Sequence, residues 1–148
     1  MAPTRDELHQ LLPAGSIVLS GSAADRDDAI QQAGALLVAA GAVGQDYVDQ
    51  MLDRERTVST YVGEGIAMPH GTLTAKDDVI VEGLSVIVLA QPVAWVDESV
   101  SVVIGIAAHG REYIALLSQL ATVLLVPGRA DALRAARSPD EVRALLAS

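Results

Sequence analysis

The chain has 148 residues, enough for one domain with a single core, and its formal charge of −9 comes from 19 acidic against 10 basic side chains. Such a surface repels nucleic acid and anionic membranes and attracts a partner with a basic face, although solubility alone is the simpler explanation. The lack of cysteine excludes disulfides and thiolate sites. No apolar run reaches the length of a bilayer span, and no signal peptide opens the chain, so we expect a cytoplasmic protein without membrane insertion.

The first third of the chain is predicted to form helices around one short strand. Thr4 and Glu7 have the spacing of a capping box, and Asp25 has the short acceptor side chain that caps helices. Apolar residues then recur at helical spacing up to Gly41, a residue that favours the end of a helix. We therefore expect helices at 4–12, 25–40 and 45–55, with a strand at 17–19 between the first two.

The middle of the chain, from 58 to 107, changes to a β pattern. Its β-branched residues predict strands at 79–81, 84–89, 93–96 and 100–107. Two of these segments, 84–89 and 100–107, are apolar at nearly every position, which is typical of strands covered on both faces. We therefore expect helices on both sides of a sheet.

The last third of the chain returns to helix. Residues 110–126 are apolar almost all round, so this helix is predicted to be substantially buried. Shorter helices are predicted at 130–136 and from Pro139, where Ser138 and Glu141 form a second capping box. The fold class is therefore α/β, with a mixed β-sheet covered by helices on both sides, in a single domain over residues 1–148.

Several familiar catalytic motifs are missing from the chain. It has no glycine-lysine phosphate loop, no dinucleotide-binding glycine pattern, no H-E-x-x-H and no serine nucleophile elbow. Its three histidines include no close pair, so we expect neither a metal nor another cofactor. His9 reads as a surface residue. His109 follows a buried strand and is a candidate site residue, because loops at strand ends often line sites.

His70 is the strongest candidate. Pro69 fixes its own backbone angle and Gly71 permits a turn or a close approach, so the imidazole is expected on a stiff, approachable corner. A neutral imidazole can accept a phosphoryl group and pass it on. Arg54 could neutralise the phosphate oxygens, and the helix expected to start near Gly110 could add free N–H groups. A hydrogen-bonded structural histidine remains the alternative.

The segment from Asp53 to Thr72 resembles the active-site segment of a known family. This family comprises the fructose/mannitol-type enzyme IIA domains of the bacterial phosphoenolpyruvate:sugar phosphotransferase system. The sequence Thr-Tyr-Val-Gly-Glu-Gly-Ile-Ala-Met-Pro-His-Gly-Thr is most similar to the mannitol branch. Residues 46–55, 104–108 and 116–120 are also typical of the family. The resemblance covers residues 17–146, which is most of the chain.

The resemblance implies a mixed sheet with helices on both sides and a role in phosphoryl transfer. Family members accept phosphate from phospho-HPr and pass it to a IIB domain, which serves a IIC permease. The accepting histidine falls on His70, with phosphate on Nε2, and the active-site arginine falls on Arg54. The family's acidic residue falls on Glu64, which would orient the imidazole or contact a partner. An apolar surface including Ile66 and Met68 would dock HPr and IIB, although Met68 could equally belong to the core.

One position departs from the mannitol pattern. A second histidine usually lies near the start of the late helix, and Tyr113 takes its place here. A tyrosine hydroxyl can donate a hydrogen bond to a phosphoryl oxygen but supplies no positive charge. His109 or Arg111 could compensate for the lost charge.

Two other functions remain open at this point. The chain could be a regulatory IIA-like protein of the nitrogen-linked branch, or a non-catalytic interaction module in which His70 is structural. The Gly-Glu and His-Gly-Thr elements favour the sugar branch. The chain ends at Ser148, which favours a stand-alone IIA, and the sugar or polyol that it serves is left open.

Overall fold

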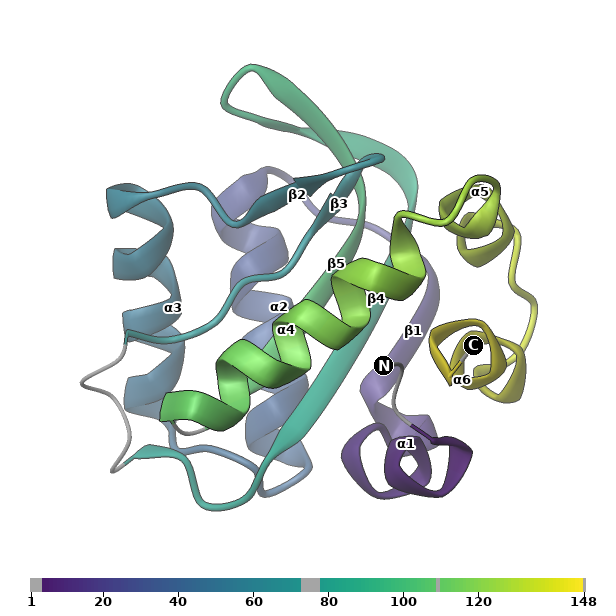
Figure 1. The fold of residues 1–148 in the computed structure, drawn as a ribbon. Helices are drawn as coiled ribbons and strands as arrows, with labels where there is room; N and C mark the ends of the chain where they lie inside the picture. The colour runs from purple at the N-terminus through teal and green to yellow at the C-terminus, as the bar shows by residue number, and fades with distance from the viewer. Residues whose placement is uncertain (1–3, 73–77, 109, 148) are drawn as a thin grey trace.

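A five-stranded sheet forms the centre of the molecule (Figure 1). The computed structural model describes residues 4–72, 78–108 and 110–147. The strands lie in the order β1-β4-β5-β3-β2. Neighbours β1 and β4 are parallel, as are β3 and β5, whereas β4 and β5, and β2 and β3, are antiparallel. The predicted mixed sheet is therefore confirmed. Its strands are β1 (Ile17–Gly21), β2 (Tyr61–Gly63), β3 (Ile66–Ala67), β4 (Gly83–Trp95) and β5 (Glu98–Ala107).

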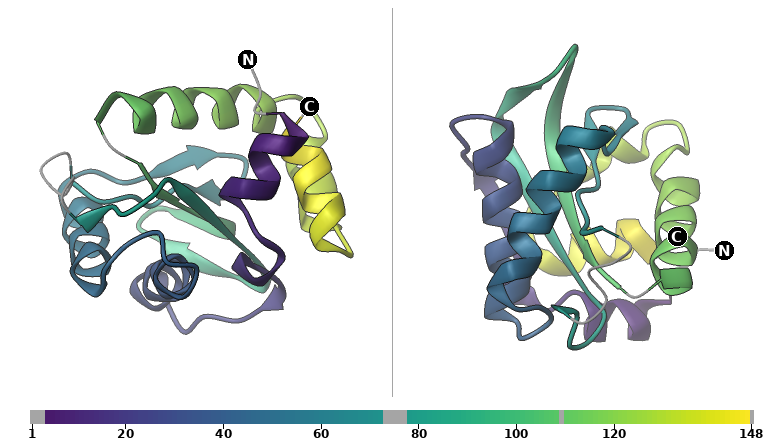
Figure 2. Two further views of the ribbon diagram at one scale, coloured as in Figure 1. Left: turned by 90° about the horizontal axis from the view of Figure 1, so that it is seen from below. Right: turned by 90° about the vertical axis from the view of Figure 1, so that its left-hand side faces the viewer.

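Helices cover both faces of this sheet, as expected. Figure 2 shows α2 (Arg26–Ala39) and α3 (Gln45–Thr57) on one side and α4 (Gly110–Leu124) on the other. The side of α4 also carries α1 (Arg5–Leu11), α5 (Arg129–Arg134) and α6 (Pro139–Ala147). Alternate residues of β4 enter different cores: Val86 and Val88 pack towards α4, and Ile87 packs towards α2. This alternation explains why the strand is apolar at nearly every position.

The helix starts predicted at Thr4 and Asp25 are confirmed by their caps, whereas the box predicted at Ser138 is only half formed, because the carboxylate of Glu141 accepts from the N–H of Arg137 instead. Thr4 accepts a bond from the backbone N–H of Glu7, whose own carboxylate accepts from the N–H of Thr4. Asp25 accepts from the backbone N–H of Asp28 at 2.8 Å. These local bonds satisfy N–H groups that the first helical turn leaves unpaired.

Two predictions in the β region are wrong. The strands expected at 84–89 and 93–96 form one strand, β4, because a register shift between Val88 and Val93 lets it continue alongside β5. Residues 79–81 do not form a strand. Val79 makes only an isolated bridge with Val43, and the N–H groups of Ile80 and Val81 both bond to the carbonyl of Ala42, outside any ladder.

The burial expected for residues 110–126 holds for one face only. Leu116, Leu120 and Leu124 lie in the core, whereas Ile114 is 57% exposed. The residues just beyond α4, Leu125 and Val126, are also largely exposed. The helix is an outer layer on one sheet face, so only its inner stripe is covered. Within the described residues, no helix is long and apolar enough to cross a membrane.

Candidate active site

The segment after β3 is fixed to the neighbouring strand. The backbone N–H of Ile106 in β5 donates to the carbonyl of Pro69 at 3.0 Å, and His70 forms a parallel bridge with Ile106. The hydroxyl of Tyr47 in α3 accepts from the N–H of Gly71 at 2.8 Å and donates to the carbonyl of Ile106 at 2.7 Å. A Cβ on Gly71 would overlap the ring of Tyr47, so glycine serves a close approach here. Burial raises the pKa of Tyr47 to about 12, so its hydroxyl keeps the proton that it donates.

The imidazole of His70 is held in one tautomer. Its Nδ1 lies 3.0 Å from the carbonyl oxygen of Met68. A carbonyl can only accept, so Nδ1 carries the proton and the neutral ring has its lone pair on Nε2. That Nε2 is buried and has no hydrogen-bond partner among the described residues. Such an orphaned nitrogen is unusual in a folded protein and identifies the group as a candidate nucleophile.

The surroundings of His70 favour its neutral form. Burial lowers its pKa below the usual 6.5, and the positive charge of Arg54 lowers it further. The Met68 carbonyl and the negative charge of Glu55 act in the opposite direction, but the net shift is downward. The ring is therefore neutral, and so nucleophilic, at neutral pH.

His70, Arg54 and Tyr113 come together around one cavity of about 120 Å³. Arg54 reaches it from the last turn of α3, where its guanidinium donates to the carbonyl of Val58 at 2.8 Å. The helix α4 runs alongside the segment that follows β3 (Figure 1) and places the ring of Tyr113 against His70, with centroids 4.6 Å apart. A guanidinium, a hydroxyl and an unpaired imidazole nitrogen around a small cavity form an arrangement suited to a phosphoryl group.

Comparison with known proteins supports the same chemistry. Residues 10–148 match the family "Phosphoenolpyruvate-dependent sugar phosphotransferase system, EIIA 2". The chain belongs to this family. It is 41% identical over 136 residues to the mannitol-specific phosphotransferase enzyme IIA component of Halalkalibacterium halodurans, covering 92% of this chain and 94% of that protein.

Two solved structures place this IIA chain within the fold. It matches the complex of enzyme IIAMTL and phosphorylated enzyme IIBMTL from Escherichia coli with a TM-score of 0.86 and 40% identity, covering 92% of this chain and 96% of that chain. It matches the nitrogen regulatory protein IIA-Ntr from Neisseria meningitidis with a TM-score of 0.77, covering 94% and 98%. The second match has 24% identity and shows the shared fold alone.

Two candidate residues of the IIA chain are not placed at this cavity. Glu64 is exposed in the turn between β2 and β3, with a left-handed φ of 58°, and does not line the cavity. Its backbone carbonyl accepts from the guanidinium of Arg134 at 2.6 Å. His109 lies outside the described residues, and the side chain of Arg111 is likewise not described. Among the described side chains, no group of three His, Asp or Glu residues could hold a metal.

Two expectations about accessibility are wrong. Ile66 and Met68 are fully buried, because both side chains belong to the core on the side of the sheet that α4 covers, so neither can form a docking surface. For Met68, the alternative of a core position is confirmed. His70 is stiffly held, as expected, but it is only 5% exposed. The ring of Tyr113 lies against it, and Met68 lines the same cavity, so the corner is less approachable than its sequence suggests.

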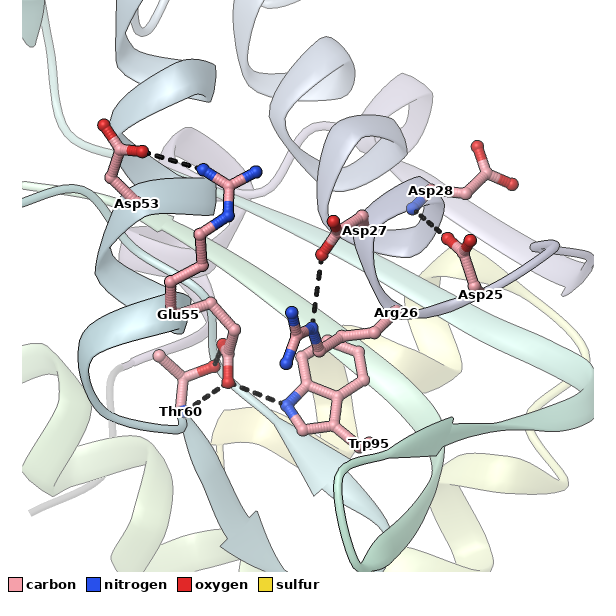
Figure 3. Close-up of polar contacts among 9 residues, drawn as sticks. Asp25, Arg26, Asp27, Asp28, Asp53, Glu55, Thr60 and Trp95 are labelled. Atoms are coloured by element: carbon pink, nitrogen blue, oxygen red, sulfur yellow. Dashed lines mark hydrogen bonds and ion pairs between the residues drawn. The ribbon is translucent and has the colours of Figure 1, made fainter.

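A buried carboxylate behind the cavity was not among the predicted site residues (Figure 3). Glu55 is 3% exposed, and one of its oxygens accepts from the indole N–H of Trp95 and the backbone N–H of Thr60, both at 2.9 Å. Its other oxygen accepts from the Thr60 hydroxyl. Thr60 lines the cavity. The sequence gives little signal for this cluster, because Trp95 lies 40 residues from Glu55.

Proposed function

We propose that this IIA chain carries a phosphoryl group on Nε2 of His70. It receives the group from phospho-HPr in the cytoplasm and passes it to a IIB component. Uptake and phosphorylation of mannitol or a related polyol then follow through a IIC permease. The observation that carries the proposal is the unpartnered Nε2 of a neutral imidazole beside Arg54, within the described part of the site. Relatives named as mannitol-specific IIA components, about 40% identical over most of their length, support the sugar assignment.

The transfer needs no net proton movement. The lone pair of Nε2 attacks the phosphorus, the bond between phosphorus and the donor's histidine nitrogen breaks, and its electron pair returns to the donor ring. The Nδ1 proton stays in place, so the phosphorylated ring becomes cationic and the carbonyl of Met68 stabilises it. Arg54 neutralises the phosphoryl oxygens. Transfer to IIB repeats these steps in reverse.

Access to Nε2 requires a side chain to move, because this nitrogen is buried. Tyr113 lies at the N-terminal part of α4 and packs against His70, and we expect its ring to swing aside as the donor docks. Its hydroxyl can then donate to a phosphoryl oxygen. Glu64 is exposed and does not line the His70 cavity, which favours contact with a partner protein over orientation of the imidazole. In this scheme, residues 1–148 work as a single IIA domain.

The alternative functions have less support. A regulatory role in the nitrogen-linked branch rests on a 24% identical structure that shares the fold, whereas the mannitol relatives are about 40% identical. A non-catalytic module does not account for a buried nitrogen without a partner in the described structure, since such a group destabilises the fold and a purely structural role gives nothing in return.

Labelling with radioactive phosphate tests the proposal. The wild-type chain, incubated with phosphoenolpyruvate, enzyme I and HPr, is expected to take up acid-labile label and to lose it when a mannitol-type IIB is added. His70→Ala should take up none, and His9→Ala, which changes a histidine of α1 outside the cavity, should label normally. Label on His70→Ala would refute the assignment. A chain that HPr phosphorylates but that passes its label to no IIB would favour the regulatory alternative.

A further inference from the structure

Glu55 is a buried ionisable group for which the phosphoryl-transfer mechanism above has no role. Removing a carboxylate from water costs several kcal/mol unless donors satisfy it. Here the N–H of Thr60, the hydroxyl of Thr60 and the indole N–H of Trp95 all point to its two oxygens (Figure 3). Each donor binds a defined side of the carboxylate, so the group fixes Thr60 in position and orientation.

Thr60 in turn connects this carboxylate to the imidazole. Its carbonyl accepts from the backbone N–H of Met68 at 3.0 Å. The carbonyl of Met68 accepts from Nδ1 of His70, also at 3.0 Å. An unbroken series of hydrogen bonds therefore runs from Trp95 through Glu55, Thr60 and Met68 to His70; we call it the Glu55 relay. The last bond of this relay decides which ring nitrogen keeps the lone pair.

We propose that Glu55 is a positioning residue for phosphoryl transfer, which acts through Thr60 and Met68 to hold the His70 ring in its reactive tautomer and orientation. The inference rests on the proposed function of His70. A misplacement of about 1 Å in a reacting group can lower a rate about 100-fold, even when the mutation is remote from the chemistry. Loss of the relay would free both Thr60, which lines the cavity, and the carbonyl that orients the ring.

Two substitutions separate the hydrogen bonds of Glu55 from its charge. Glu55→Ala removes all three bonds. In Glu55→Gln, the amide oxygen can accept the two N–H donors, and the amide nitrogen faces the Thr60 hydroxyl, which can rotate to accept. Glutamine therefore preserves the relay without the negative charge.

Arg143→Met provides a matched control for general destabilisation. Arg143 is also buried, at 7% exposure, and its guanidinium donates to the carbonyl of Leu12 at 2.8 Å and to Asp140. The first bond joins α6 to the end of α1, and the second lies within α6. Neither belongs to the relay or to the wall of the His70 cavity. The substitution removes buried hydrogen bonds without touching the His70 site.

The experiment measures the rate of phosphoryl transfer from phospho-HPr, well below each melting temperature, and the tautomer of His70 by ¹⁵N NMR. For Glu55→Ala we expect a rate about 10- to 100-fold lower and a mixture of the two neutral tautomers. Glu55→Gln and Arg143→Met should keep a rate close to wild type and the single tautomer. The inference is overturned if Glu55→Ala behaves like Arg143→Met, or if Glu55→Gln is as slow as Glu55→Ala.

A second variant keeps the test decisive if Glu55→Ala does not fold. Trp95→Phe retains an aromatic ring in the core and removes one donor to Glu55. We expect a smaller fall in rate and a detectable second tautomer, and an unchanged rate with an unchanged tautomer would overturn the inference. If the wild type is not phosphorylated at all, the proposed function fails, whereas the tautomer spectra still test the relay.

Discussion

Two of the cavities lined by an arginine, those of Arg134 and Arg54, differ in what the arginine and its neighbours have left to bind. The larger, of about 500 Å³, is lined by Arg134 and the serines 20, 99 and 101. Arg134 is already bonded to the carbonyl of Glu64, to Asp131 and to Ser101. The smaller, of about 120 Å³, holds Arg54 and His70, whose Nε2 has no partner in the described structure. The reactive site is therefore identified by an unsatisfied atom and not by volume.

The unsatisfied nitrogen has an energetic cost. A buried polar atom without a hydrogen bond destabilises a fold by about 1–3 kcal/mol. The surrounding structure holds it in place through the Met68 carbonyl and the Tyr47 hydroxyl, which binds the next residue, Gly71. The larger cavity bears no comparable cost, since Arg134 bonds to groups around it. The comparison can be tested by changing each cavity in turn.

The largest effect is expected at Arg54. Arg54→Gln should lower the rate of phosphoryl transfer by about 100- to 1,000-fold, because it removes a charged donor from the site where phosphoryl charge accumulates. The measurement is the single-turnover rate with phospho-HPr. Lysine at the same position should restore part of the rate, since it returns the charge without the two-pronged geometry. A rate within twofold of wild type would mean that the guanidinium is structural.

The next largest effect is expected from pH. Because burial lowers the pKa of His70, the neutral ring persists to a pH below 6.5. Its neutral fraction then falls about tenfold per pH unit below that pKa. NMR titration of His70 should give a midpoint below 6.5, and a midpoint above 6.5 would contradict the assigned environment.

The same shift predicts a change in stability. The unfolded chain binds a proton on this histidine near pH 6.5, whereas the folded chain resists it. The contribution of His70 to the free energy of unfolding is therefore complete above pH 6.5. It decreases as the pH falls from 6.5 to the pKa of the folded state, and it is constant below that pKa. Unfolding curves measured between pH 8 and pH 5 should therefore show the wild type losing stability relative to His70→Gln as the pH falls.

A smaller effect is expected at Tyr113. Tyr113→Phe keeps the ring beside His70 but removes the hydroxyl, and a bond to a charged oxygen contributes about 1.5 kcal/mol, or about tenfold in rate. Tyr113→His should recover at least the wild-type rate, because it restores the second histidine of the mannitol pattern. Equal rates for wild type and Tyr113→Phe would show that the hydroxyl does not touch the phosphoryl group.

The smallest effect on transfer is expected at Arg134. Arg134→Gln should lower stability by about 1 kcal/mol, since it loses the bond to the Glu64 carbonyl, and leave the transfer rate unchanged. Thermal unfolding and the same single-turnover assay check both parts. A large loss of transfer would show that the turn carrying Glu64 is coupled to the chemistry.

Local signals predicted much of this fold. Caps at Thr4 and Asp25 marked helix starts, and the apolar stretches 84–89 and 100–107 indicated a sheet covered on both faces. Predicted boundaries were wrong where strand pairing overrode the local pattern. The strand β4 continues through its register shift, and Ile80 and Val81 bond to a single carbonyl instead of joining a strand. The short strands β2 and β3 had too few residues for a periodic signal.

The site was predicted in part. The proline and glycine on either side of His70, the phosphate-binding chemistry of Arg54 and the resemblance pointed to both residues, and the structure places them with Tyr113 at one cavity. The burial of His70 could not be predicted, because it depends on a residue of α4, Tyr113, whose ring packs against the imidazole. The role of Glu55 could not be predicted either, because its partner Trp95 belongs to a strand that is distant in the sequence.

The indole that completes the Glu55 relay is the only tryptophan of the chain. The wavelength of tryptophan fluorescence depends on the polarity and charge next to the indole N–H. The protein therefore carries an intrinsic fluorescent probe at one end of the hydrogen bonds that lead to His70. Binding or release of a partner protein that disturbs these hydrogen bonds would change the fluorescence of the indole, so phosphoryl transfer could be followed without an added dye.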